Sequence, residues 1–257
     1  MKTIESRQNL NVKQWMKLKQ KKHREKLGAF IVEGTHLVEE ALKAGQVKQL
    51  LMVSDYEMPR QWQAWLEDDV ETFVLSDDIF DTLANTETPQ GIMAVCPMYQ
   101  DKLNMMSNGR YLLLDAVRDP GNMGTLIRTA DACGFNAVIV GADCVDFYNS
   151  KVLRSAQGSH FHIRLIESDI SDTMTTLQDK KVPVMGTMMT GVDVFQLESD
   201  HRGGFALLLG NEGAGVSEAY LQQTDVNVQI PIFGRAESLN VSVAGGILMY
   251  TLRDRLA

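Results

Sequence analysis

Short apolar runs alternate with segments of helical periodicity through residues 107–257. Parallel strands of one sheet must be joined by crossovers long enough to hold a helix. This alternation therefore predicts an α/β domain around a parallel sheet. Several runs are apolar almost without a break, as in strands that are covered on both faces. The predicted strands are residues 111–114, 137–140, 162–166, 182–185, 205–209 and 226–230.

Polar residues at 107–109 separate this part from a smaller N-terminal region. Within that region, residues 34–44 have the apolar spacing of a helix, whereas residues 47–53 and 91–95 favour strands. A second, smaller α/β domain is therefore expected ahead of the parallel sheet. The predicted domains are residues 1–106 and 107–257.

Composition excludes several classes of protein. The 257 residues are 44% hydrophobic and 23% charged, as in ordinary globular proteins, and no apolar run approaches the ~20 residues that cross a bilayer. Residues 1–10 lack the apolar centre of a secretory signal. The three cysteines form no C-x-x-C pair, and the five histidines do not cluster with them. We therefore expect no metal site and a reducing compartment, the cytoplasm.

The net charge of −8 counts against a nucleic-acid partner, but the positive charge is concentrated in one place. Residues 13–26 read KQWMKLKQKKHREK, with seven Lys or Arg against one Glu. Phosphate contacts need such a cluster rather than a basic average. A solvated helix surface explains the same residues equally well. The candidates for RNA contacts are Lys17, Lys21, Lys22 and Arg24.

The first polar segment after a predicted strand lies within LLLDAVRDPGNMGTLIRTADACGF, residues 112–135. A helix is expected from about Gly124, with Asn122 at its entrance and Arg128 in its first two turns. An Arg so near the positive end of a helix opposes the macrodipole, and a bound phosphate would remove that conflict. The alternative is an ordinary cap followed by a surface charge.

The second segment, FALLLGNEGAGVSE at residues 205–218, runs from a strand directly into a glycine-rich turn. Its glycines permit tight turns and close approach of a ligand to the backbone. The spacing matches neither the Rossmann nor the Walker pattern, which counts against a nucleotide-dependent oxidoreductase. Taken alone, the segment is typical of an ordinary glycine-rich turn.

The third segment is VQIPIFGRAESLNVSVAGGILMYTLR, residues 228–253. Ser238 is expected to cap a helix that begins near Leu239 and carries Asn240 in its first turn. Each helical glycine costs about 1 kcal/mol relative to alanine. The adjacent Gly245 and Gly246 therefore predict that something packs very close to this helix.

Together and in this order, the three segments resemble the signature motifs of the SpoU (TrmH-like) family of RNA methyltransferases. The matching patterns are D-x-x-x-D-P-x-N-x-G-x-x-x-R-T-A, L-G-x-E-G-x-G and I-P-x-x-G-x-x-x-S-L-N-V-S-V-A. Residues 10–97 are similar to the substrate-binding domain of the family, itself like RNA-binding ribosomal proteins. FIVEG at residues 30–34 resembles its F-x-x-E-G signature.

The resemblance implies a C-terminal α/β domain with a deep trefoil knot and a smaller RNA-binding domain before it. It also implies a homodimer that transfers a methyl group from S-adenosylmethionine to a ribose 2′-hydroxyl, without a metal. The additional N-terminal domain favours 23S ribosomal RNA as the substrate. Two alternatives stay open: a transfer RNA 2′-O-methyltransferase, and a non-catalytic RNA-binding factor of ribosome assembly on the same scaffold.

The resemblance also assigns roles to residues by motif. Its catalytic positions correspond to Asn122, Arg128, Glu212, Ser238 and Asn240, and its donor contacts to Thr187, Leu209, Gly210, Ile230 and Leu239. The family often assigns its arginine as the base, but a guanidinium with a pKa above ~12 hardly gives up a proton. We therefore expect Arg128 to contact the ribose and its phosphate and to stabilise the developing alkoxide.

Overall fold

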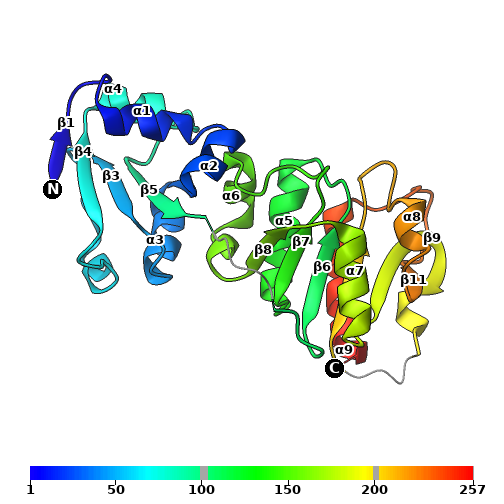
Figure 1. Cartoon of the computed structure of the whole chain (residues 1–257). Coiled ribbons are helices and arrows are strands. Elements are labelled where there is room, and N and C mark those ends of the chain that lie inside the picture. The colour runs from blue at the N-terminus through cyan, green and yellow to red at the C-terminus, as the bar shows by residue number, and fades with distance from the viewer. Residues whose placement is uncertain (99–103, 199–202, 257) are drawn as a thin grey trace. The chain divides into compact units, whose positions relative to one another are not determined.

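The computed structural model describes residues 1–98, 104–198 and 203–256. The chain folds into two compact units (Figure 1). The first consists of Met1–Gln100 and Tyr148–His162, and the second of Asp101–Phe147 and Ile163–Ala257. The segment Tyr148–His162, which lies within the predicted range 107–257, belongs to the first unit. No helix in the described ranges combines the length and apolarity needed to cross a membrane.

The first unit is built on a five-stranded sheet in the order β1-β4-β3-β5-β2. Strands β1, β4 and β3 run parallel, and β5 is antiparallel to both of its neighbours, β3 and β2. Its strands are β1 Lys2–Ile4, β2 Ala29–Glu33, β3 Gln49–Val53, β4 Glu71–Leu75 and β5 Ile92–Pro97. Its helices are α1 Leu10–Lys17, α2 Lys21–Leu27, α3 Thr35–Lys43, α4 Asp77–Leu83 and α6 Ser150–Ala156, with 3-10 turns η1 Arg60–Ala64 and η2 Ser159–Phe161.

Aromatic and polar contacts hold Tyr148–His162 in the first unit. The ring of Phe30 on β2 lies 4.5 Å from that of Tyr148 and 6.2 Å from that of Phe161, between ring centroids. Nε2 of His162 lies 3.1 Å from a carboxylate oxygen of Glu40 on α3. Because Phe30 is buried by rings from a distant part of the sequence, the core of this unit is complete only with that segment.

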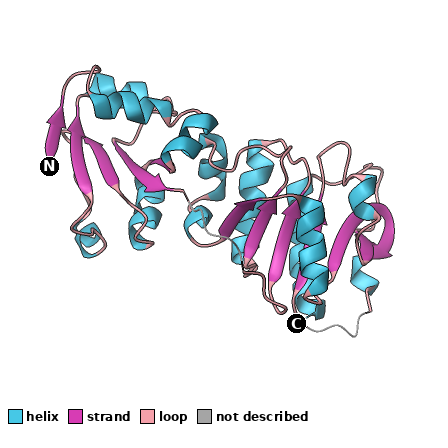
Figure 2. Cartoon of the chain, in the orientation of Figure 1, coloured by secondary structure: helices cyan, strands magenta, loops and turns pink. Residues whose placement is uncertain are grey.

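The second unit contains a six-stranded sheet in the order β11-β9-β10-β6-β7-β8, in which every pairing is parallel. Helices cover both of its faces (Figure 2). The prediction of a parallel α/β domain is confirmed. The strands are β6 Arg110–Leu114, β7 Ala137–Val140, β8 Arg164–Glu167, β9 Val184–Asp193, β10 Phe205–Leu209 and β11 Val226–Gln229. The helices are α5 Pro120–Ala132, α7 Ile170–Asp179, α8 Glu218–Leu221 and α9 Val241–Leu256, with the 3-10 turn η3 Val194–Gln196.

Strand β9 extends well beyond its predicted end at residue 185. Along β11, the partner of Asn227 is Gly186 and the partner of Val228 is Val192, so residues 187–191 bulge out of the ladder. A Cβ on Gly191 would lie 2.6 Å from the carbonyl oxygen of Asn227, which explains the glycine at this close approach. The trefoil knot concerns how the C-terminal segment threads through a loop, and it stays a prediction.

Candidate active site

The three motif segments follow β6, β10 and β11, whose carboxyl ends lie at one edge of the sheet, as predicted. Strands β6 and β10 are neighbours, with Leu114 opposite Leu209. The Asp115 N–H donates to the Leu209 carbonyl at 2.8 Å, so the first two motifs begin side by side. Ligands of open α/β sheets bind at this edge.

The first motif begins its helix earlier than predicted. Helix α5 starts at Pro120, and its cap is Asp119, whose Oδ1 accepts from the Asn122 N–H at 2.8 Å. The predicted start near Gly124 is wrong, and the cap is Asp119 rather than Asn122, which the alternative reading made the cap. Proline suits the first helical position because its fixed φ fits the helix and its missing N–H would have no helical partner.

This early start also changes the argument for Arg128. Arg128 comes eight positions after Pro120. At about 1.5 Å of rise per residue it lies about 12 Å along the helix, beyond the reach of the macrodipole. The positive end of α5 already faces the carboxylates of Asp119 and Glu212. The macrodipole of α5 therefore gives no reason to expect a bound phosphate beside Arg128. Arg128 is exposed, and among the described residues no side chain or backbone group pairs with its guanidinium.

The Glu212 carboxylate joins the first two motifs. It accepts hydrogen bonds from the Arg118 N–H at 3.3 Å, the Asp119 N–H at 3.0 Å and Nδ2 of Asn122 at 3.1 Å. Its contact with Arg118 is thus with the backbone of that residue. Burial raises the pKa of Glu212, but the hydrogen bonds from Asn122 and from backbone N–H groups outweigh it and lower that pKa below 4.5.

The third motif is attached through Asn240. Nδ2 of Asn240 donates to Oδ1 of Asn122 at 2.9 Å, so a chain of hydrogen bonds runs from Asn240 through Asn122 to Glu212. Oδ1 of Asn240 accepts from the Ser242 N–H at 2.9 Å, at the start of α9. Asn240 therefore caps this helix, and the prediction of Ser238 as the cap is wrong. Ser238 lies in an exposed loop.

Two residues of this site were not singled out in the sequence. Oδ2 of Asp115 accepts from the Ser217 N–H at 2.8 Å. Asn211 donates from Nδ2 to the Ala116 carbonyl at 2.8 Å and accepts from the Gly213 N–H at 3.0 Å. Asp115 directly follows β6, and Asn211 is two residues past the end of β10. An Asn before Glu-Gly is typical of an Asx-turn, which is the signal that could have identified Asn211.

Glu212 should make the fold sensitive to acid. Its folded-state pKa is lowered, so its carboxylate stabilises the protein above the unfolded-state pKa, and this contribution is lost as pH falls through the folded pKa. We expect Glu212→Gln to lower the free energy of unfolding by about 1 kcal/mol or less near neutral pH, because solvent screens this exposed residue. The difference from the unsubstituted protein should shrink at a pH low enough to protonate this carboxylate in the folded protein. Urea unfolding at both pH values measures it, and an equal difference at both would contradict the role.

Three of the predicted donor-binding residues lie together, Thr187 within β9 and Leu209 with Gly210 at the end of β10. Oγ1 of Thr187 donates to the Leu208 carbonyl at 3.0 Å. The Leu209 side chain is buried, so it supports the site from within the core. A Cβ on Gly210 would lie 2.1 Å from the backbone of Gly215, which explains why a glycine occupies this turn.

The other two, Ile230 and Leu239, follow β11. Ile230 is half-buried and Leu239 is 37% exposed, in a loop that is exposed from residue 233 to 240. Exposed apolar side chains are otherwise unfavourable, but they suit a ligand with an apolar or aromatic part, such as an adenosine. The bound donor would supply an electrophilic methyl group, and these residues fit it. Among the described residues from 188 to 239, the exposed large apolar side chains are Met188, Met189, Val192, Phe195, Phe233 and Leu239.

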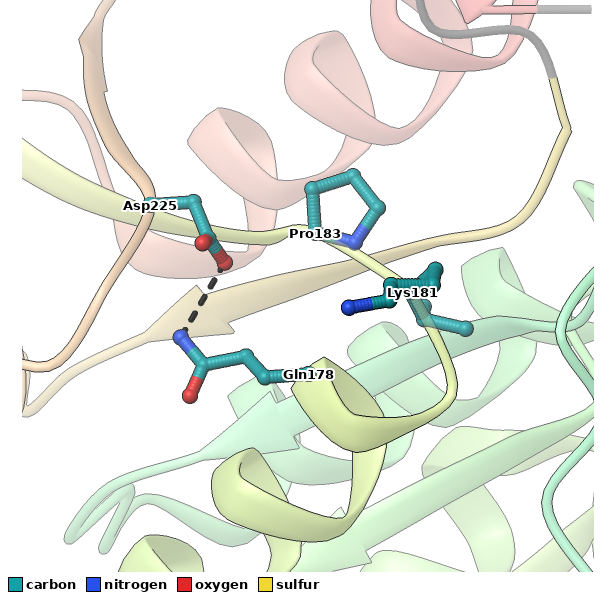
Figure 3. A pocket seen from close by; sticks show the side chains of 5 residues that line it. Gln178, Lys181, Pro183 and Asp225 are labelled. Carbon is teal, nitrogen blue, oxygen red and sulfur yellow. Dashed lines mark hydrogen bonds between the residues drawn. The ribbon is translucent and has the colours of Figure 1, made fainter.

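A cavity of about 310 Å³ lies at the amino ends of β9 and β11, away from the motifs (Figure 3). The Asp225 carboxylate there accepts from the Val184 N–H at 2.8 Å and from Nε2 of Gln178 at 3.1 Å, so it joins β9 to α7. Within the described ranges, no cluster of His, Cys, Asp or Glu is suited to a metal. The cavity is lined by Gln178, Lys181, Val182, Pro183 and Asp225.

The basic stretch of the first unit is only partly available to RNA. Lys17 and Lys22 are exposed, and Lys21 lies 3.7 Å from Glu25. Arg24, in contrast, is 6% exposed and donates from its guanidinium to the Leu18 carbonyl at 2.8 Å. Arg24 thus supports the turn between α1 and α2, which corrects its place among the phosphate contacts.

The glycine pair of α9 is explained within one chain. A Cβ on Gly245 would lie 2.5 Å from the Leu126 side chain of α5 and 2.8 Å from that of Leu209. A Cβ on Gly246 would make only an ordinary contact with Thr129, at 3.8 Å. The predicted close packing is therefore found between α9 and its neighbours α5 and β10.

Comparison with known proteins gives the same assignment for both units. The model of the "SpoU rRNA Methylase family" matches residues 109–250, and that of the "MRM3-like substrate binding domain" matches residues 9–94. The chain is 48% identical to the 23S rRNA (guanosine(2553)-2′-O)-methyltransferase RlmP of Bacillus subtilis, over 98% of this chain and 100% of that one. It is 30% identical to the 23S rRNA (uridine(2479)-2′-O)-methyltransferase of Streptomyces viridochromogenes, over 97% of this chain and 91% of that one.

Solved structures agree over the whole length of the chain. The AdoMet-bound rRNA methyltransferase from Sinorhizobium meliloti has a TM-score of 0.87 at 30% identity and covers 100% of this chain and 98% of its own. The SpoU methyltransferase AviRb from Streptomyces viridochromogenes, in complex with AdoMet, has a TM-score of 0.86 at 29% identity, over 96% and 98%. This chain belongs to the SpoU rRNA methylase family and is an S-adenosylmethionine-dependent RNA 2′-O-methyltransferase.

Proposed function

We propose that the enzyme methylates the ribose 2′-hydroxyl of a guanosine in 23S ribosomal RNA, at the position that corresponds to the target of the Bacillus subtilis relative. The observation that carries this proposal is the 48% identity, which extends over the full length of both chains and so over both units. Relatives at lower identity have other targets, as the uridine-specific enzyme illustrates at 30%. A relative of high sequence identity should therefore share the target nucleotide of this enzyme more closely than a relative of low identity does.

Transfer RNA is the weaker candidate for the substrate. A structure concerned with 2′-OH methylation of C/U34 on tRNA matches this chain with a TM-score of 0.52 at 25% identity. It covers 97% of its own chain but only 58% of this one. The part of this chain that this match does not cover is long enough to form a further substrate-binding unit, which favours ribosomal RNA. The second alternative, a non-catalytic factor, does not explain why the chain of hydrogen bonds from Glu212 through Asn122 to Asn240 is intact.

In this proposal the polar residues of the site have different roles. Glu212, Asn122 and Asn240 hold the three motif loops in one arrangement, which fixes where donor and ribose meet. Arg128 keeps its proton, so we assign it to binding the ribose and its phosphate and to stabilising the alkoxide that forms as the hydroxyl proton leaves. Ser238 is assigned to substrate contact from its exposed loop.

The target is tested by mapping 2′-O-methyl groups in 23S ribosomal RNA from cells with and without the protein. One methylated guanosine should disappear in its absence and return when the protein is supplied. Arg128→Ala serves as the control that should not restore it. If the methyl group that disappears is on a transfer RNA, or if none disappears, the proposed substrate is wrong.

We also place the enzyme in the cytoplasm, where ribosomal RNA and a reducing environment occur together. Cys96, Cys133 and Cys144 are all free thiols. Burial raises the pKa of Cys144 to about 11 and that of Cys96 still further, so both thiols are unreactive at neutral pH.

A homodimer is the expected assembly. Since Gly245 is used within the chain, the support now comes from Val243 and Tyr250, which are 52% and 47% exposed and lie seven residues apart on one side of α9. Such apolar side chains favour a covering partner. Sedimentation at micromolar concentration should give twice the chain mass of 28.7 kDa, and the Val243→Glu/Tyr250→Glu variant should shift toward the monomer. A monomer for the unsubstituted protein would contradict the assembly.

The exposed lysines of α1 and α2 should supply RNA affinity. Each phosphate contact with single-stranded RNA contributes about 0.7 to the slope of log affinity against log salt, so replacing Lys17, Lys21 and Lys22 with Gln should weaken binding and lower the slope by about 2. Donor affinity should be unaffected, because these residues lie in the other unit. RNA titrations across a range of salt concentrations measure both quantities.

The matched control removes three lysines of the same unit that already pair with carboxylates. These are Lys2, Lys43 and Lys48, which lie beside Glu71, Glu39 with Glu40, and Asp69 respectively. Their replacement with Gln makes the same change in net charge. If both triple variants weaken RNA binding equally, the basic stretch is an ordinary solvated surface.

A further inference from the structure

Helix α6 brings residues from the middle of the catalytic sequence into the first unit. It packs on β2, which is the edge strand of that sheet, and α2 packs on the same strand. Figure 1 shows α6 in green beside α2 in blue. Two helices that are far apart in the sequence therefore contact the same edge strand of the first unit.

The exposed side of α6 is purely cationic. Its sequence, SKVLRSA, contains Lys151 and Arg154 and no carboxylate. These two residues are three positions apart and so lie on one side of the helix, while Val152, Leu153 and Ala156 are buried against the unit. Lys151 is exposed and Arg154 is half-exposed. In the ranges that the structure describes, neither has a carboxylate partner.

The carboxylates of the neighbouring helices are already engaged. Glu25 on α2 lies near Lys21 at 3.7 Å. Glu40 on α3 contacts both Lys43, at 2.9 Å, and His162, at 3.1 Å. Glu25 and Glu40 therefore already have cationic partners. Like Lys151, Lys22 and Lys26 on α2 are exposed cations.

We propose that Lys151 and Arg154 of α6 bind RNA phosphates and form one surface with Lys22 and Lys26 of α2. The inference rests on the proposed RNA substrate and extends its binding site to residues outside the N-terminal sequence. The ligand class is the sugar-phosphate backbone, since a lysine supplies a point charge and an arginine can bind a phosphate with two hydrogen bonds. The surface carries no base-specific group, so it contributes affinity and orientation rather than sequence choice.

The test uses the full-length Lys151→Gln/Arg154→Gln variant and unmodified 23S ribosomal RNA transcribed in vitro. The slope of log affinity against log salt should fall by about 1.4, two contacts at about 0.7 each. Donor affinity by calorimetry and thermal unfolding should stay unchanged, because both side chains point outward. Lys151→Glu should weaken RNA binding more than Lys151→Gln does. The control is Lys2→Gln/Lys48→Gln, which removes two charges of the same unit.

Failure of the inference and failure of the proposed function give different results. If the unsubstituted enzyme methylates 23S ribosomal RNA but the α6 variant keeps its affinity and salt slope, the surface is wrong and the function stands. If the enzyme methylates only transfer RNA, while the α6 variant loses affinity for that RNA, the function is wrong and the surface stands. An equal loss in the Lys2→Gln/Lys48→Gln control would also overturn the surface.

Discussion

Arg128→Ala is expected to abolish methyl transfer while S-adenosylmethionine affinity stays nearly unchanged. Removing one electrostatic group at a reacting oxygen lowers the rate by about 10²–10³-fold in other enzymes, and Arg128 should also bind the substrate phosphate. It is exposed and makes no described contact that holds the fold, so its loss should not destabilise the protein. Single-turnover transfer and calorimetric titration with the donor measure the two effects.

Arg128→Lys is the informative comparison for this variant. Lysine keeps the charge but loses the planar fork that binds a phosphate with two hydrogen bonds, so activity should be only partly restored. Near-normal turnover of Arg128→Ala would remove Arg128 from the reaction. A large loss of donor affinity in the same variant would instead place it in the donor site.

Gly210→Ala should disrupt both donor binding and stability. The added Cβ would lie 2.1 Å from the backbone of Gly215 and of Val216, and backbone atoms cannot turn aside as a flexible side chain can. The turn must therefore open, which moves Glu212 away from Asn122. We expect a loss of about 1–3 kcal/mol in unfolding free energy, in the range of overpacked sites, and no measurable donor binding by calorimetry.

The same turn offers a matched control. A Cβ on Gly213 would make only an ordinary contact, 3.7 Å from Oδ1 of Asn211. Gly213→Ala should therefore retain nearly normal stability and donor affinity. If Gly210→Ala and Gly213→Ala behave alike, the close approach of the two backbones is not what this position requires.

The strands of the second unit were the most predictable part of the fold. Strands β7 and β10 begin and end where the apolar runs do, because every residue in them is buried and so must be apolar. The extension of β9 could not be predicted in the same way. Residues 186–193 include the bulge at 187–191, where the regular pattern of burial is lost.

The polar residues of the site were identified by motif, but their partners were not. Asp119 and Asn122 are both good capping residues, and only the position of Pro120 distinguishes them. Likewise, Arg24 lies in a run of exposed cations, and nothing in the local sequence indicates that its guanidinium turns inward to the Leu18 carbonyl. Such choices depend on contacts between segments that the sequence does not bring together.

The return of Tyr148–His162 to the first unit has a consequence for protein synthesis. The chain passes between the two units three times, so cutting the connection near residue 100 would not release an intact N-terminal unit. On the ribosome, the ring of Phe30 stays uncovered until Tyr148 and Phe161 have been synthesised. At about 5–20 residues per second, the 62 residues from 100 to 162 take about 3–12 s to be added. During that interval the nascent N-terminal unit exposes an aromatic surface, a natural point of contact for a chaperone.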